Sequence, residues 1–117
     1  MGRMITRLAV LGSTGSIGQQ TLEVVRALPD RFRIVGLAAG KNVDLLAKQI
    51  NEFKPRFVCY QSKKARLTNA EYEFLSLEDI ARHPQVDTVV IATPGKAGLS
   101  PTLAAVNAGK NVALANK

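Results

Sequence analysis

Short apolar runs alternate with longer amphipathic segments along the chain. The short runs are rich in Val, Ile, Leu and Ala, which is typical of buried strands, and the longer segments repeat apolar residues at helical spacing. Strands are predicted over residues 8–11, 32–39, 57–60, 88–92 and 112–115. Helices are predicted over residues 17–28, 43–53 and 99–108, while residues 71–80 combine an alternating stretch with a helix start.

This order of elements predicts βαβ units and a parallel sheet. Strands that are apolar throughout are expected where helices cover both faces of the sheet. We therefore expect an α/β fold, a Rossmann-like doubly wound domain with a mostly parallel sheet. The chain has 117 residues, of which 46% are apolar, and this suffices for one domain with one core. Because the chain stops directly after a predicted strand, residues 1–117 are expected to be a fragment of a longer protein.

The composition narrows the choice of ligand. Sixteen Lys and Arg against 9 Asp and Glu give a net charge of +7, which attracts anions. With 5% aromatic residues and no Trp, the composition gives little support to nucleic-acid binding. No apolar run approaches the ~20 residues of a membrane helix. A phosphorylated small molecule is the favoured ligand, and the alternative is a solvated basic surface.

Cysteine and histidine chemistry is sparse. A lone Cys59 cannot form an internal disulfide and fits a reducing compartment. Together with His83, the only histidine, it is too little for a Cys/His zinc site. No pairing of a nucleophile with a base is visible, so both residues are interpreted as structural. No catalytic or metal-binding residue is predicted in this chain.

A glycine-rich loop joins the first predicted strand to the first predicted helix. Its residues are Gly12, Ser13, Thr14, Gly15, Ser16, Ile17 and Gly18. In such a loop the first glycine permits the tight turn, the second lets a pyrophosphate approach the backbone, and the third allows close helix packing. Free N–H groups and the positive helix end would face the phosphates, and the three hydroxyls would add donors. The spacing is G-x-x-G-x-x-G, and the alternative is a merely structural turn.

The end of the second predicted strand bears on the choice of cofactor. An NAD-binding domain places an acidic residue ~20 residues past the glycine loop. Here the sequence has Gly40, Lys41 and Asn42, with no carboxylate before Asp44. Because Lys41 would attract a 2′-phosphate, the sequence favours NADPH over NADH. The alternative is that Lys41 is a solvated residue before a helix.

Two later segments also follow predicted strands. Residues 92–98 contain two glycines and a proline, and in a dinucleotide-binding fold they would lie near the nicotinamide-side ribose. An ordinary turn is equally plausible for this loop. Asn116 and Lys117 come after the last strand, where a lysine could hold a substrate phosphate or hydroxyl; a solvated terminal lysine is the alternative.

Four segments, taken in order, resemble the N-terminal part of the 1-deoxy-D-xylulose 5-phosphate reductoisomerase family. They are residues 12–18 with 21–22, residues 39–42, residues 97–99 with 101–105, and residues 108–110 with 114–117. The resemblance implies an enzyme that rearranges 1-deoxy-D-xylulose 5-phosphate to a branched aldehyde phosphate. It then reduces the aldehyde with NADPH to 2-C-methyl-D-erythritol 4-phosphate. This is the committed step of non-mevalonate isoprenoid biosynthesis, and fosmidomycin inhibits it.

The same resemblance implies where ligands bind. The NADPH phosphates would contact Thr14, Gly15, Ser16 and Ile17. The adenosine 2′-phosphate would contact Gly40, Lys41 and Asn42. The nicotinamide would lie near Asn116, and the substrate would contact Lys117. The divalent cation (Mg or Mn) would be held by a later domain, so this fragment alone is expected to be inactive. The full-length protein is expected to be a homodimer that acts on a phosphorylated sugar and binds neither nucleic acid nor membrane. A bacterial cytoplasm is favoured as its location, with plastids as the alternative.

Two other functions are compatible with the residues. One is the N-terminal domain of another NADP-dependent reductase with the same glycine spacing, such as a semialdehyde dehydrogenase or dihydrodipicolinate reductase. The segments at residues 40–42 and 115–117 argue against it. The other is a non-catalytic Rossmann module that senses a nucleotide.

Overall fold

The computed structural model describes residues 4–61, 66–93 and 95–114. Its strands are β1 (Thr6–Leu11), β2 (Phe32–Ala38), β3 (Phe57–Cys59), β4 (Glu73–Phe74), β5 (Thr88–Ile91) and β6 (Asn111–Leu114). Its helices are α1 (Ser16–Ala27), α2 (Val43–Phe53), α3 (Leu77–Ala81) and α4 (Leu99–Asn107), and a 3-10 turn, η1 (Gly95–Gly98), precedes α4. The ambiguous residues 71–80 divide into a short strand and a short helix, and the other predicted elements are found within about two residues of their expected bounds.

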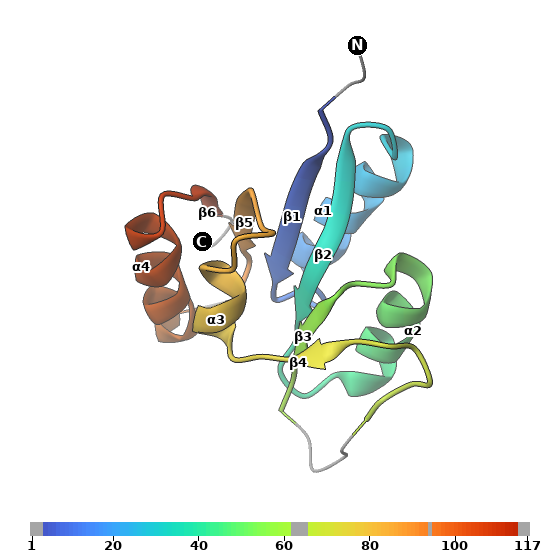
Figure 1. Ribbon diagram of the computed structural model, residues 1–117. Helices are drawn as coiled ribbons and strands as arrows, with labels where there is room; N and C mark the ends of the chain where they lie inside the picture. Colours follow the sequence, from blue (N-terminus) through green and yellow to red (C-terminus); the bar gives the residue numbers. More distant parts are fainter. Residues whose placement is uncertain (1–3, 62–65, 94, 115–117) are drawn as a thin grey trace.

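The strands form one sheet with helices on both faces (Figure 1). The strand order is β4-β3-β2-β1-β5-β6, and each pairing between neighbours is parallel. The chain therefore winds outward from β1 through β2 and β3, then returns to the other side of β1 to form β5 and β6. Apart from the short edge strand β4, this is the order of a doubly wound, Rossmann-like sheet with strands on both sides of β1, so the predicted α/β fold is confirmed.

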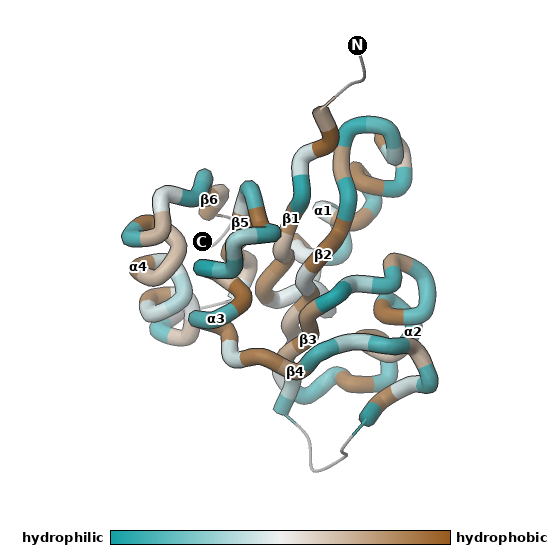
Figure 2. Tube along the Cα trace, viewed as in Figure 1, coloured by the Kyte–Doolittle hydropathy of each residue, from teal (hydrophilic) through white to brown (hydrophobic). Residues whose placement is uncertain are grey.

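Apolar side chains fill both sides of the sheet because successive residues of a strand face opposite ways. Leu8 and Val10 of β1 belong to a core cluster that also contains Leu22 of α1 and Leu46 of α2. Ala9 and Leu11 of β1 face the other way and belong to a second cluster, which also contains residues of α3 and α4. In Figure 2, brown segments run along parts of β1 and β2, and α1 and α2 change between brown and teal along their length. This explains why residues 8–11 of β1 and 34–38 of β2 carry no polar side chain, whereas Arg7 and Arg33 lie near the starts of these strands.

The outer side of β6 and α4 is less covered. Leu99, Leu103 and Val106 of α4 and Leu114 of β6 are exposed. Within the part of the chain that the structure describes, no helix has the length and apolar character to cross a membrane.

An ion pair fastens the start of β1 to the turn before β5. The Arg7 guanidinium donates to both carboxylate oxygens of Asp87, at 3.1 Å and 3.0 Å, and the Arg7 backbone N–H donates to the same carboxylate at 2.8 Å. These hydrogen bonds hold the pKa of Asp87 below its usual range. The contact joins residues 80 positions apart at the end of the sheet opposite to the carboxyl ends of the strands.

We expect Asp87→Asn to destabilise the chain at neutral pH and to have a smaller effect in acid. A carboxylate whose folded pKa is lowered adds stability that is fully present above its unfolded pKa, about 3.9, and is lost as pH falls through the lower folded value. Urea unfolding from pH 7 down to pH 3 measures this directly. Glu73→Gln, which removes an exposed carboxylate on β4, is the matched control. An equal loss of stability at both ends of this pH range would contradict the expectation.

Candidate nucleotide-binding site

The sheet reverses its winding direction between β1 and β5, and a cavity of about 280 Å³ lies at the carboxyl ends of these strands. Open α/β sheets bind their ligands at this kind of switch point. The cavity lining includes Gly12, Thr14, Gly15, Gly40, Thr93 and Ala97. The structure thus brings together the glycine loop, the end of β2 and the loop after β5, which are far apart in the sequence.

The glycine loop leaves β1 by an abrupt turn. Gly12 has φ +93°, and a Cβ there would lie 2.7 Å from the carbonyl carbon of Ala92. The backbone N–H groups of Gly12 and Ser13 both donate to the carbonyl oxygen of Ala38, at 2.8 Å and 2.9 Å. Glycine is required at position 12 by both its φ and the closeness of the neighbouring strand end, as the motif predicts.

The other two glycines of the motif differ in what surrounds them. A Cβ on Gly18 would lie 2.0 Å from the Gly12 carbonyl oxygen, so α1 packs directly onto the loop. The predicted close packing is therefore present, but its partner is the loop rather than a strand. A Cβ on Gly15 would meet nothing closer than 3.6 Å. The fold does not require glycine at position 15, which agrees with the room that a bound pyrophosphate needs.

The first turn of α1 presents unpaired donors. The first helical hydrogen bond runs from the Gln19 N–H to the Gly15 carbonyl oxygen, at 2.9 Å. The N–H groups of Ser16, Ile17 and Gly18 have no backbone acceptor among the described residues. The N-cap residue is Gly15, which supplies no side-chain cap, and the first turn holds no acidic residue. The N–H groups and the helix dipole together create positive potential at this end.

The hydrogen bond of the Ser13 side chain contradicts one prediction. Its side chain is fully buried, and its hydroxyl donates to Oε1 of Gln49 at 2.7 Å. The expectation that the Ser13 hydroxyl is a free donor for phosphate is therefore wrong, because an internal acceptor already takes it. Thr14 is half-buried and Ser16 is exposed, and neither hydroxyl has a hydrogen-bond partner among the described residues.

The end of β2 presents a cation and a helix start. Lys41 is exposed and forms no ion pair with any described residue. Oδ1 of Asn42 accepts from the Leu45 N–H at 3.3 Å and so caps α2. This leaves the Asn42 side-chain N–H groups to other partners. Gly40 is exposed, and a Cβ there would have open space around it.

The loop after β5 contributes a polar atom that the sequence did not single out. Thr93 lines the cavity, and its Oγ1 is buried without a hydrogen-bond partner among the described residues. A Cβ on Gly98 would lie 3.1 Å from this oxygen, so η1 packs closely onto it. A buried hydroxyl without a partner costs free energy, and such groups in native proteins often mark the position of a ligand or water.

Two further predicted residues, Asn116 and Lys117, lie outside the described residues.

Cys59 and His83 serve the fold. Burial raises the pKa of the Cys59 thiol, which disfavours the reactive thiolate. Nδ1 of His83 accepts from the Gln85 N–H at 3.1 Å, and its ring packs on Phe57 with centroids 4.0 Å apart. These contacts agree with the structural interpretation of both residues.

Known proteins resemble the chain closely. The sequence profile of 1-deoxy-D-xylulose 5-phosphate reductoisomerase matches residues 8–117. The chain is 47% identical over 122 residues to the chloroplastic reductoisomerase of Oryza sativa subsp. japonica, covering 94% of this chain and 26% of that protein. It is 45% identical over 121 residues to the reductoisomerase of Pelotomaculum thermopropionicum, covering 94% of this chain and 31% of that protein.

Solved structures agree. A DOX-P reductoisomerase in complex with NADPH, fosmidomycin and magnesium superposes with a TM-score of 0.90 at 42% identity, over 96% of this chain and 30% of the other. The Zymomonas mobilis enzyme in complex with NADPH gives a TM-score of 0.85 at 32% identity, over 97% of this chain and 32% of the other. The chain spans about a third or less of the length of these relatives.

Proposed function

Because this chain belongs to the 1-deoxy-D-xylulose 5-phosphate reductoisomerase family, we propose that it is the NADPH-binding domain of such an enzyme. The single observation that carries the proposal is the cavity at the switch point of the sheet. There the glycine loop faces the end of β2, and Lys41 follows directly after the cavity residue Gly40. An anionic dinucleotide needs donors for its pyrophosphate and a cation for its 2′-phosphate, and these segments supply both.

The residues that line the cavity and those directly beside it fit NADPH. The N–H groups of Ser16, Ile17 and Gly18 would donate to the pyrophosphate, with Gly15 leaving room for it and the hydroxyls of Thr14 and Ser16 adding donors. Lys41 and the Asn42 amide would hold the 2′-phosphate. The buried Thr93 hydroxyl, which lacks a partner among the described residues, would gain one. From the resemblance, Asn116 would lie near the nicotinamide and Lys117 would contact the substrate.

The activity of the whole enzyme follows from the same family. It would isomerise 1-deoxy-D-xylulose 5-phosphate to a branched aldehyde phosphate. A hydride from NADPH and a proton would then reduce the aldehyde carbonyl to the alcohol of 2-C-methyl-D-erythritol 4-phosphate. The role of this chain is to bind and orient the cofactor that supplies the hydride. From the resemblance, a divalent cation would be held by a later domain of the full-length enzyme, and a solved relative is a complex with magnesium. We further propose a homodimer in a bacterial cytoplasm; the relatives include bacterial and chloroplastic proteins.

Calorimetric titration of the purified chain with NADPH and, separately, with NADH tests the proposal. We expect saturable binding of NADPH and weaker binding of NADH. Circular dichroism establishes that the titrated chain is folded. A folded chain that binds neither nucleotide would contradict the proposal that these residues form the site. Turnover of 1-deoxy-D-xylulose 5-phosphate by the full-length protein tests the wider activity, and its absence would favour another NADP-dependent reductase.

A further inference from the structure

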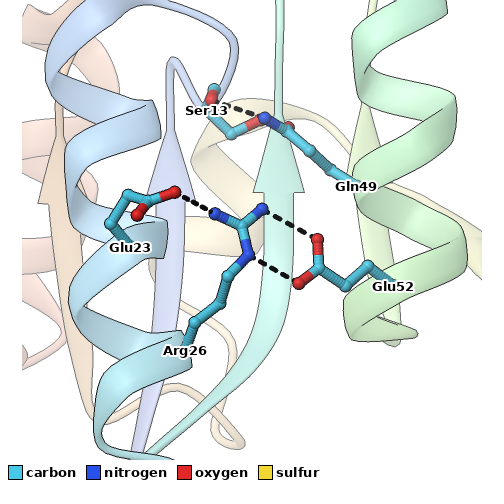
Figure 3. Close-up of polar contacts among 5 residues, drawn as sticks. All are labelled: Ser13, Glu23, Arg26, Gln49 and Glu52. Carbon is cyan, nitrogen blue, oxygen red and sulfur yellow. Dashed lines mark hydrogen bonds and ion pairs between the residues drawn. The ribbon is translucent and has the colours of Figure 1, made fainter.

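Gln49 of α2 holds the glycine loop by two hydrogen bonds (Figure 3). Its Oε1 accepts from the Ser13 hydroxyl at 2.7 Å, and its Nε2 donates to the Ser13 carbonyl oxygen at 2.9 Å. The orientation of the amide is unambiguous, because a carbonyl oxygen can only accept. One side chain thus engages both the side chain and the backbone of a loop residue 36 positions away.

The position of Gln49 is unusual for its chemistry. It is 3% exposed and lies on the inner face of α2, beside Leu46 and Ile50, which are fully buried. An apolar residue would pack there without the cost of burying an amide, and a buried amide is tolerated only when it is hydrogen-bonded. The two hydrogen bonds to Ser13 meet that condition. Packing alone gives no reason for glutamine at this position, whereas holding the loop does.

The two ends of this contact belong to different parts of the site. Ser13 lies inside the loop whose following residues face the pyrophosphate in the proposed function. Gln49 lies on the helix that begins at Asn42, directly after Lys41. The contact therefore joins the segment that would hold the pyrophosphate to the helix whose start would hold the 2′-phosphate.

A second contact joins α2 to α1 but leaves the loop untouched. Arg26 of α1 donates to both carboxylate oxygens of Glu52, at 2.6 Å and 2.8 Å, and to Glu23 of its own helix (Figure 3). These groups are exposed at the protein surface, where ion pairs contribute little. Gln49 and Glu52, the α2 residues of the two contacts, lie three positions apart, so variants at these two positions can be compared directly.

We propose that Gln49 is a positioning residue that holds the glycine loop at a set distance from the start of α2 and thereby raises the preference for NADPH. The inference rests on the proposed function. NADPH must reach both phosphate subsites at once, so its affinity depends on their being held in advance at the right separation. NADH has no 2′-phosphate and uses only the pyrophosphate subsite of the pair. Loosening the loop should therefore weaken NADPH binding more than NADH binding.

The test is calorimetric titration of the chain carrying Gln49→Met, which keeps the length of the side chain but removes both hydrogen bonds. We expect the Kd for NADPH to rise about tenfold and the Kd for NADH about threefold, so that the preference falls about threefold, a difference expected for lost preorganisation. Ser13→Ala removes only one of the hydrogen bonds and is the milder variant if Gln49→Met does not fold. Ser13→Ala should also lower the preference for NADPH over NADH, but by less than Gln49→Met does.

Glu52→Ala is the control, since it breaks the contact between α1 and α2 without touching the loop, and its preference should equal that of the unaltered chain. If the role of Gln49 were merely structural, Gln49→Met would reduce the folded fraction and would weaken the binding of NADPH and of NADH by the same factor. An unchanged ratio in a folded Gln49→Met or Ser13→Ala chain would therefore overturn the inference while leaving the proposed function intact. Failure of the unaltered chain to bind NADPH would overturn both.

Discussion

Gly18→Ala should prevent the chain from folding. The added Cβ would lie 2.0 Å from the Gly12 carbonyl oxygen and 2.7 Å from the Ser13 Cα. Both are backbone atoms, which cannot rotate aside as a flexible side chain would. Relief would require α1 to move away from the loop, or the loop to leave the carbonyl of Ala38 that binds it. Ordinary overpacking costs about 1–3 kcal/mol, and this overlap should cost at least about 4 kcal/mol, most of the stability of a small domain.

Gly15→Ala is the matched control, with the same substitution three residues earlier. Its Cβ would have no neighbour within 3.6 Å, so we expect a folded chain whose free energy of unfolding changes by no more than about 1 kcal/mol. Because Gly15 lines the cavity, the added methyl should weaken NADPH binding all the same. Circular dichroism and urea unfolding of both variants provide the measurement. A Gly18→Ala chain as stable as the unaltered one would show that the loop and helix are not packed as described.

Lys41→Ala should abolish most of the preference for NADPH. The Lys41 ammonium is exposed just before α2, where a 2′-phosphate would form charge-assisted hydrogen bonds with it. Such bonds contribute about 1.5–3 kcal/mol, so the Kd for NADPH should rise about 10–100-fold. NADH has no phosphate at this position, so its Kd should change by less than about threefold. Paired titrations with the two nucleotides give both values.

Lys48→Ala controls for the loss of one positive charge. Lys48 is exposed on α2, beyond the first turn of the helix, so its removal should change both affinities equally and slightly. Raising the salt concentration should weaken NADPH binding to the unaltered chain more than to the Lys41→Ala chain, because screening acts on the charge that the variant lacks. A folded Lys41→Ala chain that retains its full preference would remove Lys41 from the site.

Much of the fold could be predicted because its signals are local. The bounds of α2 agree with residues 43–53, since the apolar residues at helical spacing end at Lys54 and Pro55. The central strands were recognisable because β1 buries residues on both faces, which makes the run apolar throughout. Residues 71–80 were ambiguous for the converse reason. β4 is a two-residue edge strand with exposed side chains, so its pattern carries little information about pairing.

The structure of the glycine loop could be predicted from the sequence only in part. Its spacing indicated a turn, a phosphate-binding helix start and close packing, and Gly12 and Gly18 fill the structural parts of that description. The direction of the Ser13 side chain could not be read from the motif. It depends on Gln49, whose one visible signal was an amide among the apolar residues of a helical stripe, and that pattern does not name its partner.

The sequence by itself determined the order of elements, the position of the glycine loop and the placement of Lys41 at the end of the second strand, because each depends on neighbours a few positions away. Only the tertiary structure decided which residues share the cavity, which hydroxyls stay free and which side chains hold the loop. Ser13 and Gln49 are 36 positions apart, and Arg7 and Asp87 are 80 apart. Such pairs meet only when the strands are ordered and the helices are packed on the sheet, and no local pattern encodes that arrangement.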